Sequence, residues 1–379
     1  MSSHVPSLTG KLMLSNPGNV YKYLEKCCGR FWTPKLLLTY GKPWNFITGS
    51  RSVGKSTGLA IYFLLDYIVN SHKFVYTRRT KDETLLTCST YFGNAIQIIN
   101  NKTDIKIEEF YYEGGHYYIR LNGKEAVEEC GHVIPLSLEQ KYKSTNLSDV
   151  FNVVYDEFIA KDSTGYLGTS SKPETEYIHV LSLYQTIDRG VDRPFRNETR
   201  FFFSGNTATI YNPLFLSLGI ANYIDDKARI ISPKNKLWLL ERVETVEALS
   251  EVETSFAYQL ATEEEREYAY KNKGADPTSF IKTPEVSHYD YTVILDGNSY
   301  GISHDEAYNF YICKARPEVG AQRISLDVKG HDGTDLMLIH KWNMFPAMRL
   351  ISSAYQRGQL YFYNGKAQSA FLKYLRFMP

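Results

Sequence analysis

The sequence lacks the features of membrane-spanning and secreted proteins. No apolar run approaches the ~20 residues that a membrane-spanning helix needs. The first residues, MSSHVPSLTGKLM, show no charged segment followed by an apolar one, so we expect no secretory signal. The five cysteines form no CxxC pair and no metal-type spacing, which favours reduced thiols. We therefore expect an intracellular protein without a membrane partner.

Acidic residues are absent from one long stretch. Residues 336–379 contain no Asp or Glu, but they contain six cations interleaved with aromatic residues. Residues 241–267 are instead rich in Glu, so the formal net charge of +1 hides a separation of charge that suggests different partners for different regions. Cations without acids favour a salt-sensitive, sequence-tolerant grip on nucleic acid. The candidate DNA-binding residues are Lys341, Arg349, Arg357 and Lys366.

The chain of 379 residues is long enough for two domains. A short apolar strand at 44–47, a Gly-rich loop, an apolar helix at 56–70 and a strand at 74–79 predict a βαβ unit. Residues 105–130 carry Gly114-Gly115 and Asn122-Gly123 between strand-like runs, which predicts an antiparallel meander beside or within the main sheet. Strands at 151–158 and 200–206, with a helix at 177–189 between them, complete a doubly wound α/β domain.

The stretch GSRSVGKST fits the GxxxxGK[ST] phosphate-binding motif without a gap. Its glycines let backbone N–H groups turn toward phosphate oxygens, the lysine supplies a charge to the outer phosphates, and the serine supplies a hydroxyl to Mg²⁺. The following helix presents its positive end to the anion. The predicted ATP-binding residues are Gly49, Ser50, Arg51, Ser52, Val53, Gly54, Lys55, Ser56 and Thr57.

An acid pair ends the strand at 151–158. Asp156 is placed to hold Mg²⁺ together with Ser56, and Glu157 to polarise the attacking water, so we expect hydrolysis rather than binding alone. Asn206 ends the strand at 200–206 and is a candidate sensor of the γ-phosphate. A basic cluster, from which one arginine can reach the γ-phosphate of a neighbouring subunit, consists of Arg189, Arg193, Arg196 and Arg200.

The order of these motifs resembles the genome-packaging ATPases of small podophages, which are relatives of the terminase large subunits. The resemblance is carried by GSRSVGKS, YTRRTKDE (76–83), PLSLEQKYKSTN (135–146), VVYDEFI and SGNTATIYNPLF (204–215), and it is weaker in the C-terminal region. It implies an ASCE-type P-loop NTPase domain over residues 1–225, with a doubly wound, largely parallel sheet. It further implies a helical acidic linker over 226–280 and, over 281–379, a smaller α+β ribonuclease-H-like domain, a vestigial nuclease that binds DNA and portal.

The resemblance also implies roles for individual residues. Glu157 activates water, Asp156 holds Mg²⁺, and Arg189 and Lys143 act between subunits. The basic turn formed by Arg78, Arg79 and Lys81 lies near the pore and the nucleotide. The segment between Arg189 and Arg200 is longer than in the family, which leaves Arg193 and Arg196 as competitors for the trans role.

The function that the resemblance implies is an ATP-hydrolysing motor that moves double-stranded viral DNA into a preformed capsid. The implied partners are the DNA, a homo-oligomeric (pentameric) ring, and the portal or connector of the procapsid, with or without a structural RNA. The implied location is the host cytoplasm, with transient docking on the procapsid. Three alternatives stay open. The first is a packaging terminase with an active nuclease, for which Asp296, Asp305, Asp327, Asp332 and Asp335 are available. The second is a P-loop helicase or recombination ATPase, and the third is a scaffold that binds nucleotide without hydrolysing it.

Overall fold

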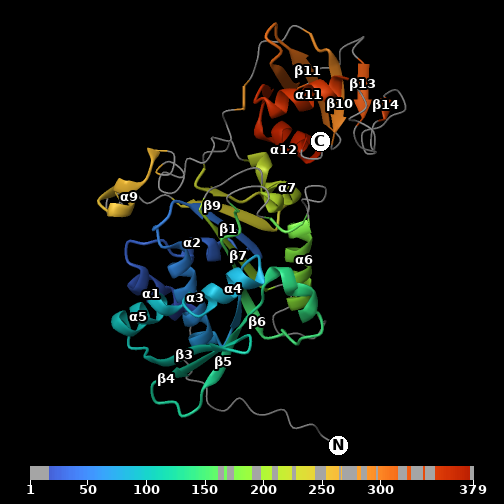
Figure 1. The fold of residues 1–379 in the computed structure, drawn as a ribbon. Helices are drawn as coiled ribbons and strands as arrows, with labels where there is room; N and C mark the ends of the chain where they lie inside the picture. Colours follow the sequence, from blue (N-terminus) through green and yellow to red (C-terminus); the bar gives the residue numbers. More distant parts are fainter. Residues whose placement is uncertain are drawn as a thin grey trace, which may run out of the picture. The chain divides into compact units, whose positions relative to one another are not determined.

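We describe the protein from a computed structural model of the chain (Figure 1). The structure describes residues 17–160, 166–168, 175–189, 198–206, 212–223, 228–243, 253–263, 266, 280–282, 288–295, 298–314, 322–325, 336–337 and 346–375. The chain divides into two compact units, of which unit 1 comprises residues 1–159, 179–207 and 232–272, and unit 2 the remainder. Among the helices in the described ranges, none combines the length and apolarity needed to cross a bilayer.

Both units contain helices and strands. The strands are β1 (Trp44–Gly49), β2 (Lys73–Thr77), β3 (Ile107–Glu113), β4 (His116–Leu121), β5 (Glu128–Val133), β6 (Val150–Asp156), β7 (Arg200–Gly205), β8 (Ile230–Ile231), β9 (Trp238–Val243), β10 (Tyr291–Leu295), β11 (Asn298–His304), β12 (Phe310–Lys314), β13 (Gln322–Ser325), β14 (Leu336–Met337) and β15 (Leu360–Phe362). The helices are α1 (Pro17–Cys28), α2 (Lys35–Thr39), α3 (Lys55–Asn70), α4 (Lys81–Cys88), α5 (Gly93–Lys102), η1 (Leu136–Tyr142), α6 (Thr175–Ile187), α7 (Pro213–Leu218), η3 (Ile220–Tyr223), α9 (Phe256–Leu260), α11 (Pro346–Gln356) and α12 (Gly365–Leu375).

The strands of unit 1 lie in the order β3-β4-β5-β2-β6-β7-β1-β9. The six strands from β5 to β9 in this order pair in parallel, whereas β3, β4 and β5 pair antiparallel. The meander thus extends the parallel sheet through the β5–β2 pair, and β7 is the additional strand between β1 and β6. The additional strand confirms the predicted ASCE-type α/β fold, and the meander confirms the antiparallel extension predicted for residues 105–130.

Helices cover both faces of the parallel sheet (Figure 1). On one face, Tyr62 and Phe63 of α3 contact Phe202 of β7, and α1 and α5 pack on α3. On the other face, Tyr184 of α6 contacts Trp44 of β1. Because successive side chains of a strand alternate between faces, central strands covered on both sides are buried along their length, and β1 and β6 are buried throughout and β7 at every residue after Arg200.

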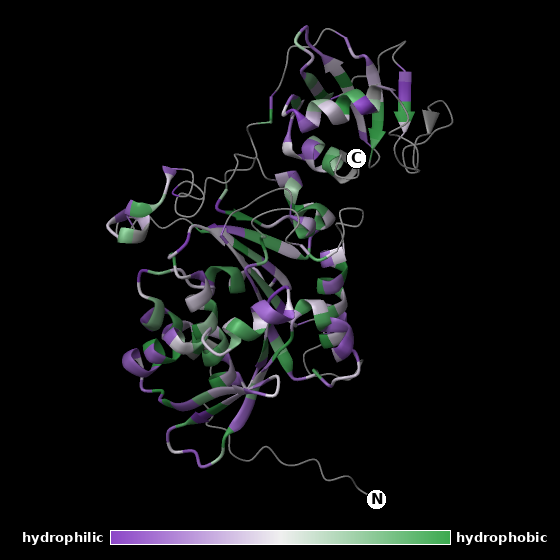
Figure 2. Ribbon diagram, in the orientation of Figure 1, coloured by the Kyte–Doolittle hydropathy of each residue, from purple (hydrophilic) through white to green (hydrophobic). Residues whose placement is uncertain are grey.

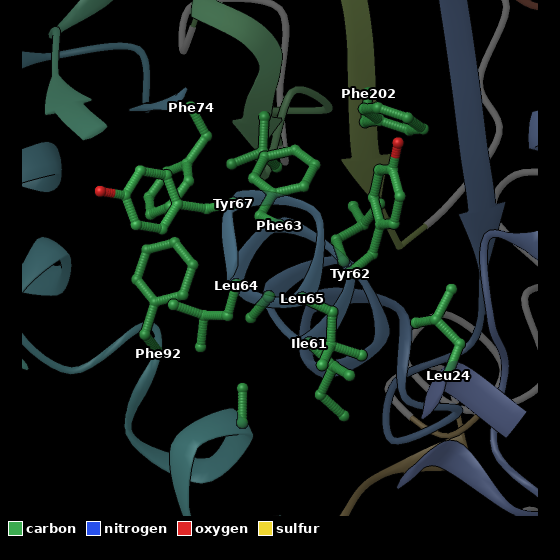
Figure 3. Packing of buried hydrophobic residues seen from close by; sticks show 14 of the residues in the cluster. Leu24, Ile61, Tyr62, Phe63, Leu64, Leu65, Tyr67, Phe74, Phe92 and Phe202 are labelled. Atoms are coloured by element: carbon green, nitrogen blue, oxygen red, sulfur yellow. The ribbon is translucent and has the colours of Figure 1, made fainter. Parts of the chain in front are cut away.

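An aromatic cluster of unit 1 lies between α3 and the sheet. Phe63 is fully buried, with ring centroids 5.8 Å from Phe74 and 5.6 Å from Phe202, and Phe74 in turn contacts Phe92 (Figure 3). Figure 2 shows the same hydrophobic character along the central strands and α3, with more hydrophilic residues at the β3–β4 edge. This packing anchors α3, whose amino end follows the loop of residues 49–54.

The predicted helical linker over 226–280 is wrong for residues 238–243. These residues form β9, which pairs with β1 in parallel along the whole length of both strands. The many glutamates of this region favoured the prediction of a solvated helix. Glu241 belongs to the Glu-rich stretch, but its side chain is fully buried and accepts a hydrogen bond of 2.9 Å from the Trp32 indole. The run WLLERV is apolar enough to have indicated a strand.

The second sheet has, among the described residues, the order β14-β13-β10-β11-β12-β15. β10, β11 and β12 form an antiparallel meander, and β13 and β14 add in parallel on the β10 side. This mixed sheet agrees with the ribonuclease-H-like fold predicted for residues 281–379. The aromatic residues Phe362 and Phe371 are buried in its core.

Candidate active site

The phosphate-binding motif lies between β1 and α3, as predicted. β1 ends at Gly49, residues 51–54 form turns, and α3 begins at Lys55. Since β1, β6 and β7 are parallel neighbours, their carboxyl ends meet at one edge of the sheet. This edge brings together the loop, the acid pair and Asn206.

Two glycines of the loop stand where a side chain does not fit. A Cβ on Gly49 would lie 2.4 Å from the backbone oxygen of Val243, the last residue of β9. Gly54 has a φ of +92°, and its Cβ would lie 2.9 Å from Cβ of Phe31. The loop is therefore fixed between β9 and the segment before α2, and this snug backbone approach leaves a cradle suited to phosphate oxygens.

Lys55 is the charged group at the centre of the loop. Its side chain is buried, and Nζ donates to the carbonyls of Gly49 (2.8 Å) and Ser50 (2.7 Å). Burial lowers the pKa of Lys55 to about 8, against the opposing effect of Glu157 and Asp156. A buried ammonium held only by carbonyls is unfavourable, so an anion in the loop would relieve it.

Ser56 and Asp156 meet at the start of α3. The Ser56 hydroxyl donates to Oδ1 of Asp156 at 3.2 Å, and Arg78 donates to Oδ2 at 2.7 Å. A hydroxyl beside a carboxylate is a donor set that suits a hard cation such as Mg²⁺. Sequence reasoning had placed Arg78 near the nucleotide without a partner; the structure shows that the partner is the carboxylate of the acid pair. Despite its burial, the pKa of Arg78 is raised by Asp156.

Glu157 and Asn206 face one another at the ends of β6 and β7. The Asn206 amide donates to both oxygens of Glu157 at 3.3 Å, and its Oδ1 lies 3.5 Å from Nζ of Lys55. Glu157 has a φ of +54°, a left-handed conformation that non-glycine residues adopt mainly where the surroundings impose it. Burial, and secondly Asp156, raise the pKa of the Glu157 carboxyl. The arrangement joins Lys55, Asn206 and Glu157 in one polar contact chain.

Arg189 and Lys143 lie together, but away from this chain of contacts. The exposed Arg189 guanidinium donates to the backbone carbonyls of Lys143 and of Thr145, the latter at 3.0 Å. Arg189 follows α6, which runs from the carboxyl end of β6 back to the amino end of β7, so it lies toward the sheet edge opposite the phosphate loop. Arg193 and Arg196 lie outside the described residues.

The predicted DNA-binding cations are surface residues where the structure describes them. Arg349 on α11, Arg357 after it and Lys366 on α12 are exposed, and Lys366 donates to Oδ1 of Asn298 at 3.1 Å. Lys341 lies outside the described residues.

Asp305, one of the aspartates available to a nuclease, caps its own hairpin turn. It accepts hydrogen bonds from the backbone of Ala307 and Asn309, from the Asn309 amide and from Tyr311. Asp296, Asp327, Asp332 and Asp335 lie outside the described residues.

Known proteins resemble the chain over nearly its full length. The sequence matches the family described as "Podovirus DNA encapsidation protein (Gp16)" over residues 26–378. The DNA packaging protein of Bacillus phage phi29 is 26% identical over 338 residues, which cover 88% of this chain and 93% of that protein. The DNA packaging protein of Bacillus phage B103 is 25% identical over 332 residues, covering 86% and 95%.

Solved structures agree with these relatives. A chain of the bacteriophage Phi-29 viral genome packaging motor assembly matches with a TM-score of 0.62 and 25% identity, covering 92% of this chain and 100% of that chain. A chain of the Phi-28 gp11 DNA packaging motor has the same fold, with a TM-score of 0.58, 20% identity and coverage of 92% and 97%. The resemblance and the fold class are thereby confirmed, and the chain belongs to the podovirus DNA encapsidation protein family.

Proposed function

We propose that this family member is the ATP-hydrolysing motor that translocates double-stranded viral DNA into a preformed capsid. Family membership supplies the task, DNA encapsidation. The observation that supports the chemistry is the contact chain from Lys55 through Asn206 to Glu157, beside the Ser56–Asp156 pair. Phosphate binding, metal binding and water activation thus share one edge of the sheet, as hydrolysis requires.

In this proposal the loop residues 49–57 hold ATP, and Lys55 exchanges its carbonyl partners for the outer phosphates. Ser56 and Asp156 would hold Mg²⁺, which, when bound with ATP, neutralises charge that develops on the phosphate oxygens. Arg78 orients the Asp156 carboxylate through their 2.7 Å contact.

Glu157 orients the attacking water and takes up its proton. The raised pKa of this carboxyl strengthens it as a base. Asn206 holds both carboxylate oxygens, so a γ-phosphate that draws the amide away would release Glu157 toward the water. Asn206 then links the presence of ATP to the readiness of the base.

Arg189 and Lys143 act on a neighbouring subunit in a homo-oligomeric, pentameric ring. Their shared exposed position toward the opposite edge of the sheet supports a trans role, because Arg189 already holds the Lys143 segment and both are accessible. The ring docks on the portal or connector of the procapsid, with or without a structural RNA, from the host cytoplasm.

Residues 281–379 grip DNA and portal without cutting. Exposed cations on α11 and α12 neutralise backbone phosphates. The hydrogen bonds that Asp305 accepts within its own hairpin favour a structural role for this one aspartate.

The deciding experiment mixes the protein, ATP, viral DNA and empty procapsids, and measures DNA protected from added nuclease. We expect ATP-dependent protection, its loss in Glu157→Gln with ATP binding retained, and normal protection in the control Glu125→Gln, which changes an exposed glutamate on the loop before β5. The loss in turnover for Glu157→Gln is about 10²–10⁴-fold for removal of a general base. Full protection by Glu157→Gln would contradict the assignment of the base.

The same preparation separates the alternatives. Nicking of plasmid in Mn²⁺ would identify a terminase with an active nuclease. Unwinding of forked DNA without procapsid-dependent protection would identify a helicase.

A further inference from the structure

Three metal-ligating side chains gather on β4 and β5. His116, Glu129 and His132 each offer a ligand atom, and these atoms lie within 4.8 Å of one another. Nδ1 of His116 lies 2.9 Å from Oε2 of Glu129 and 3.2 Å from Nδ1 of His132. In a tetrahedral zinc site with bonds of about 2.0–2.1 Å, ligand atoms are roughly 3.3 Å apart, so both distances are near those of a metal-bound set.

The local strand geometry produces this cluster. His116 and His132 are opposite one another in the antiparallel β4–β5 pair. The register shifts after Tyr117, so that Tyr118 pairs with Glu129 and one residue of β5, Cys130, is extra. Such a bulge places residues three apart on one face of the sheet, which brings Glu129 beside both histidines.

Hydrogen bonding alone does not satisfy the cluster. If Nδ1 of His116 carries a proton, it donates to Glu129, and His132 then keeps its proton on Nε2, which is buried with no hydrogen-bond partner and lies 3.8 Å from the carboxylate. If His132 instead donates from Nδ1, the unprotonated nitrogen of His116 faces the Glu129 oxygen at 2.9 Å, lone pair against lone pair. Each arrangement leaves at least one mismatch in a place where mismatches are costly.

A divalent cation removes the lone-pair conflict between His116 and Glu129 because it accepts one lone pair from each of His116, Glu129 and His132. Nε2 of His132 still has no hydrogen-bond partner when Nδ1 is the ligand atom. The nearby charges are compatible with a bound cation. Lys73 contacts Oε1 of Glu129 (2.7 Å) and Asp149 (2.9 Å). With neutral histidines, the three charged groups Lys73, Glu129 and Asp149 therefore sum to one negative charge. Lys73 occupies one carboxylate oxygen and leaves the other toward His116, in the manner of an outer-shell partner of a metal ligand.

We propose that His116, Glu129 and His132 form a binding site for a transition-metal dication of the zinc type, with water as the fourth ligand. A ligand set of two imidazoles and a carboxylate favours Zn²⁺ over Mg²⁺. The site fastens β4 to β5 and so holds the antiparallel extension on the parallel sheet. It uses none of the residues assigned to ATP.

The test loads the full chain with Zn²⁺ after chelation and measures bound metal by mass spectrometry, with Co²⁺ absorption in the visible range as a report of tetrahedral geometry. His116→Gln is the informative variant because His116 is the half-buried member, with a side chain 38% exposed. The matched control is His304→Gln, a histidine of similar exposure that pairs with Asp290 at 2.7 Å outside the cluster.

We expect one Zn²⁺ per chain for the wild type and for His304→Gln. We expect a loss on the order of a hundredfold or more in affinity for His116→Gln, since even outer-shell changes cost 10–100-fold. A wild-type chain that binds neither Zn²⁺ nor Co²⁺, or a His116→Gln variant that binds as tightly as the wild type, would overturn the proposal. Circular dichroism of both variants separates loss of a ligand from loss of fold.

Discussion

The two regions differ in whether their charged side chains are buried or exposed. We call the edge of the unit 1 sheet that carries the loop of residues 49–57 the phosphate edge. There, the residues Lys55, Asp156 and Arg79 are at most 6% exposed. In the C-terminal lobe, which we define as residues 280–375, the buried polar side chains of the described residues are all uncharged: Thr292, Ser303, Ser325, Ser352, Gln368 and Ser369. Its candidate DNA-binding cations are exposed.

Buried charges suit chemistry on a small bound ligand, whereas exposed cations suit binding to DNA. Burying a charge is costly unless a partner compensates, and low-dielectric surroundings strengthen each interaction that a buried charge makes. A site built from buried charges therefore acts on a ligand that brings complementary charge, such as a nucleotide. Exposed cations interact weakly and collectively with a long polyanion, and salt screens them.

The largest effect is expected from Arg189→Ala. An arginine that completes the site of a neighbouring subunit contributes about 10³–10⁵-fold to turnover. We expect at least about a thousandfold loss of ATP hydrolysis by assembled rings, with nucleotide binding to the isolated chain unchanged. Mixing the variant into wild-type rings should inhibit more steeply than dilution, as measured by turnover against the mixing ratio.

The control for this experiment is Arg120→Ala. Arg120 is a surface arginine that pairs with Glu108 and Glu109 on the meander. A linear decrease for Arg189→Ala, equal to simple dilution, would show that Arg189 acts only within its own chain, where it holds the Lys143 segment.

The sequence was sufficient to predict the phosphate edge because its residues follow strands directly. Gly49, Asp156 and Asn206 end or follow β1, β6 and β7, and parallel strands bring these ends together without further information. The pairing of Arg78 with Asp156 depends on side-chain direction, which neither motif nor spacing fixes.

Other features depended on register and burial. The sequence does not predict β9 because a glutamate in a Glu-rich stretch is typical of a solvated surface. Only the tertiary structure shows that Glu241 accepts a hydrogen bond from Trp32 in the core. The cluster of His116, Glu129 and His132 depends on a bulge at Cys130, and a one-residue shift in register has no signature in composition.

A smaller effect is expected from pH, through Lys55. Burial holds the pKa of Lys55 at about 8 in the nucleotide-free chain, and bound phosphate favours the charged form and raises it. Nucleotide binding above pH 8 therefore takes up a proton, and affinity falls as pH rises, by up to about tenfold per pH unit. Below pH 8 the lysine is already charged and affinity should depend little on pH.

Calorimetry in two buffers of different ionisation enthalpy measures this proton uptake directly. Lys55→Arg is the matched variant because a guanidinium stays charged, so its affinity, although weaker, should not vary through this range. Equal pH profiles for the two proteins would locate the buried-charge effect elsewhere.

The smallest effects belong to the exposed cations. Arg349→Ala, Arg357→Ala and Lys366→Ala should each weaken duplex binding several-fold, equally for unrelated sequences, and each should lower the slope of log affinity against log salt by about 1. Their effect on stability should stay within about 0.5 kcal/mol, as for surface substitutions generally. Lys26→Ala on α1 is the control, an exposed lysine of unit 1. If instead Lys26→Ala lowered the slope and the three C-terminal variants did not, the grip would lie on unit 1, and the same fold region would have to combine buried charge for hydrolysis with exposed charge for DNA.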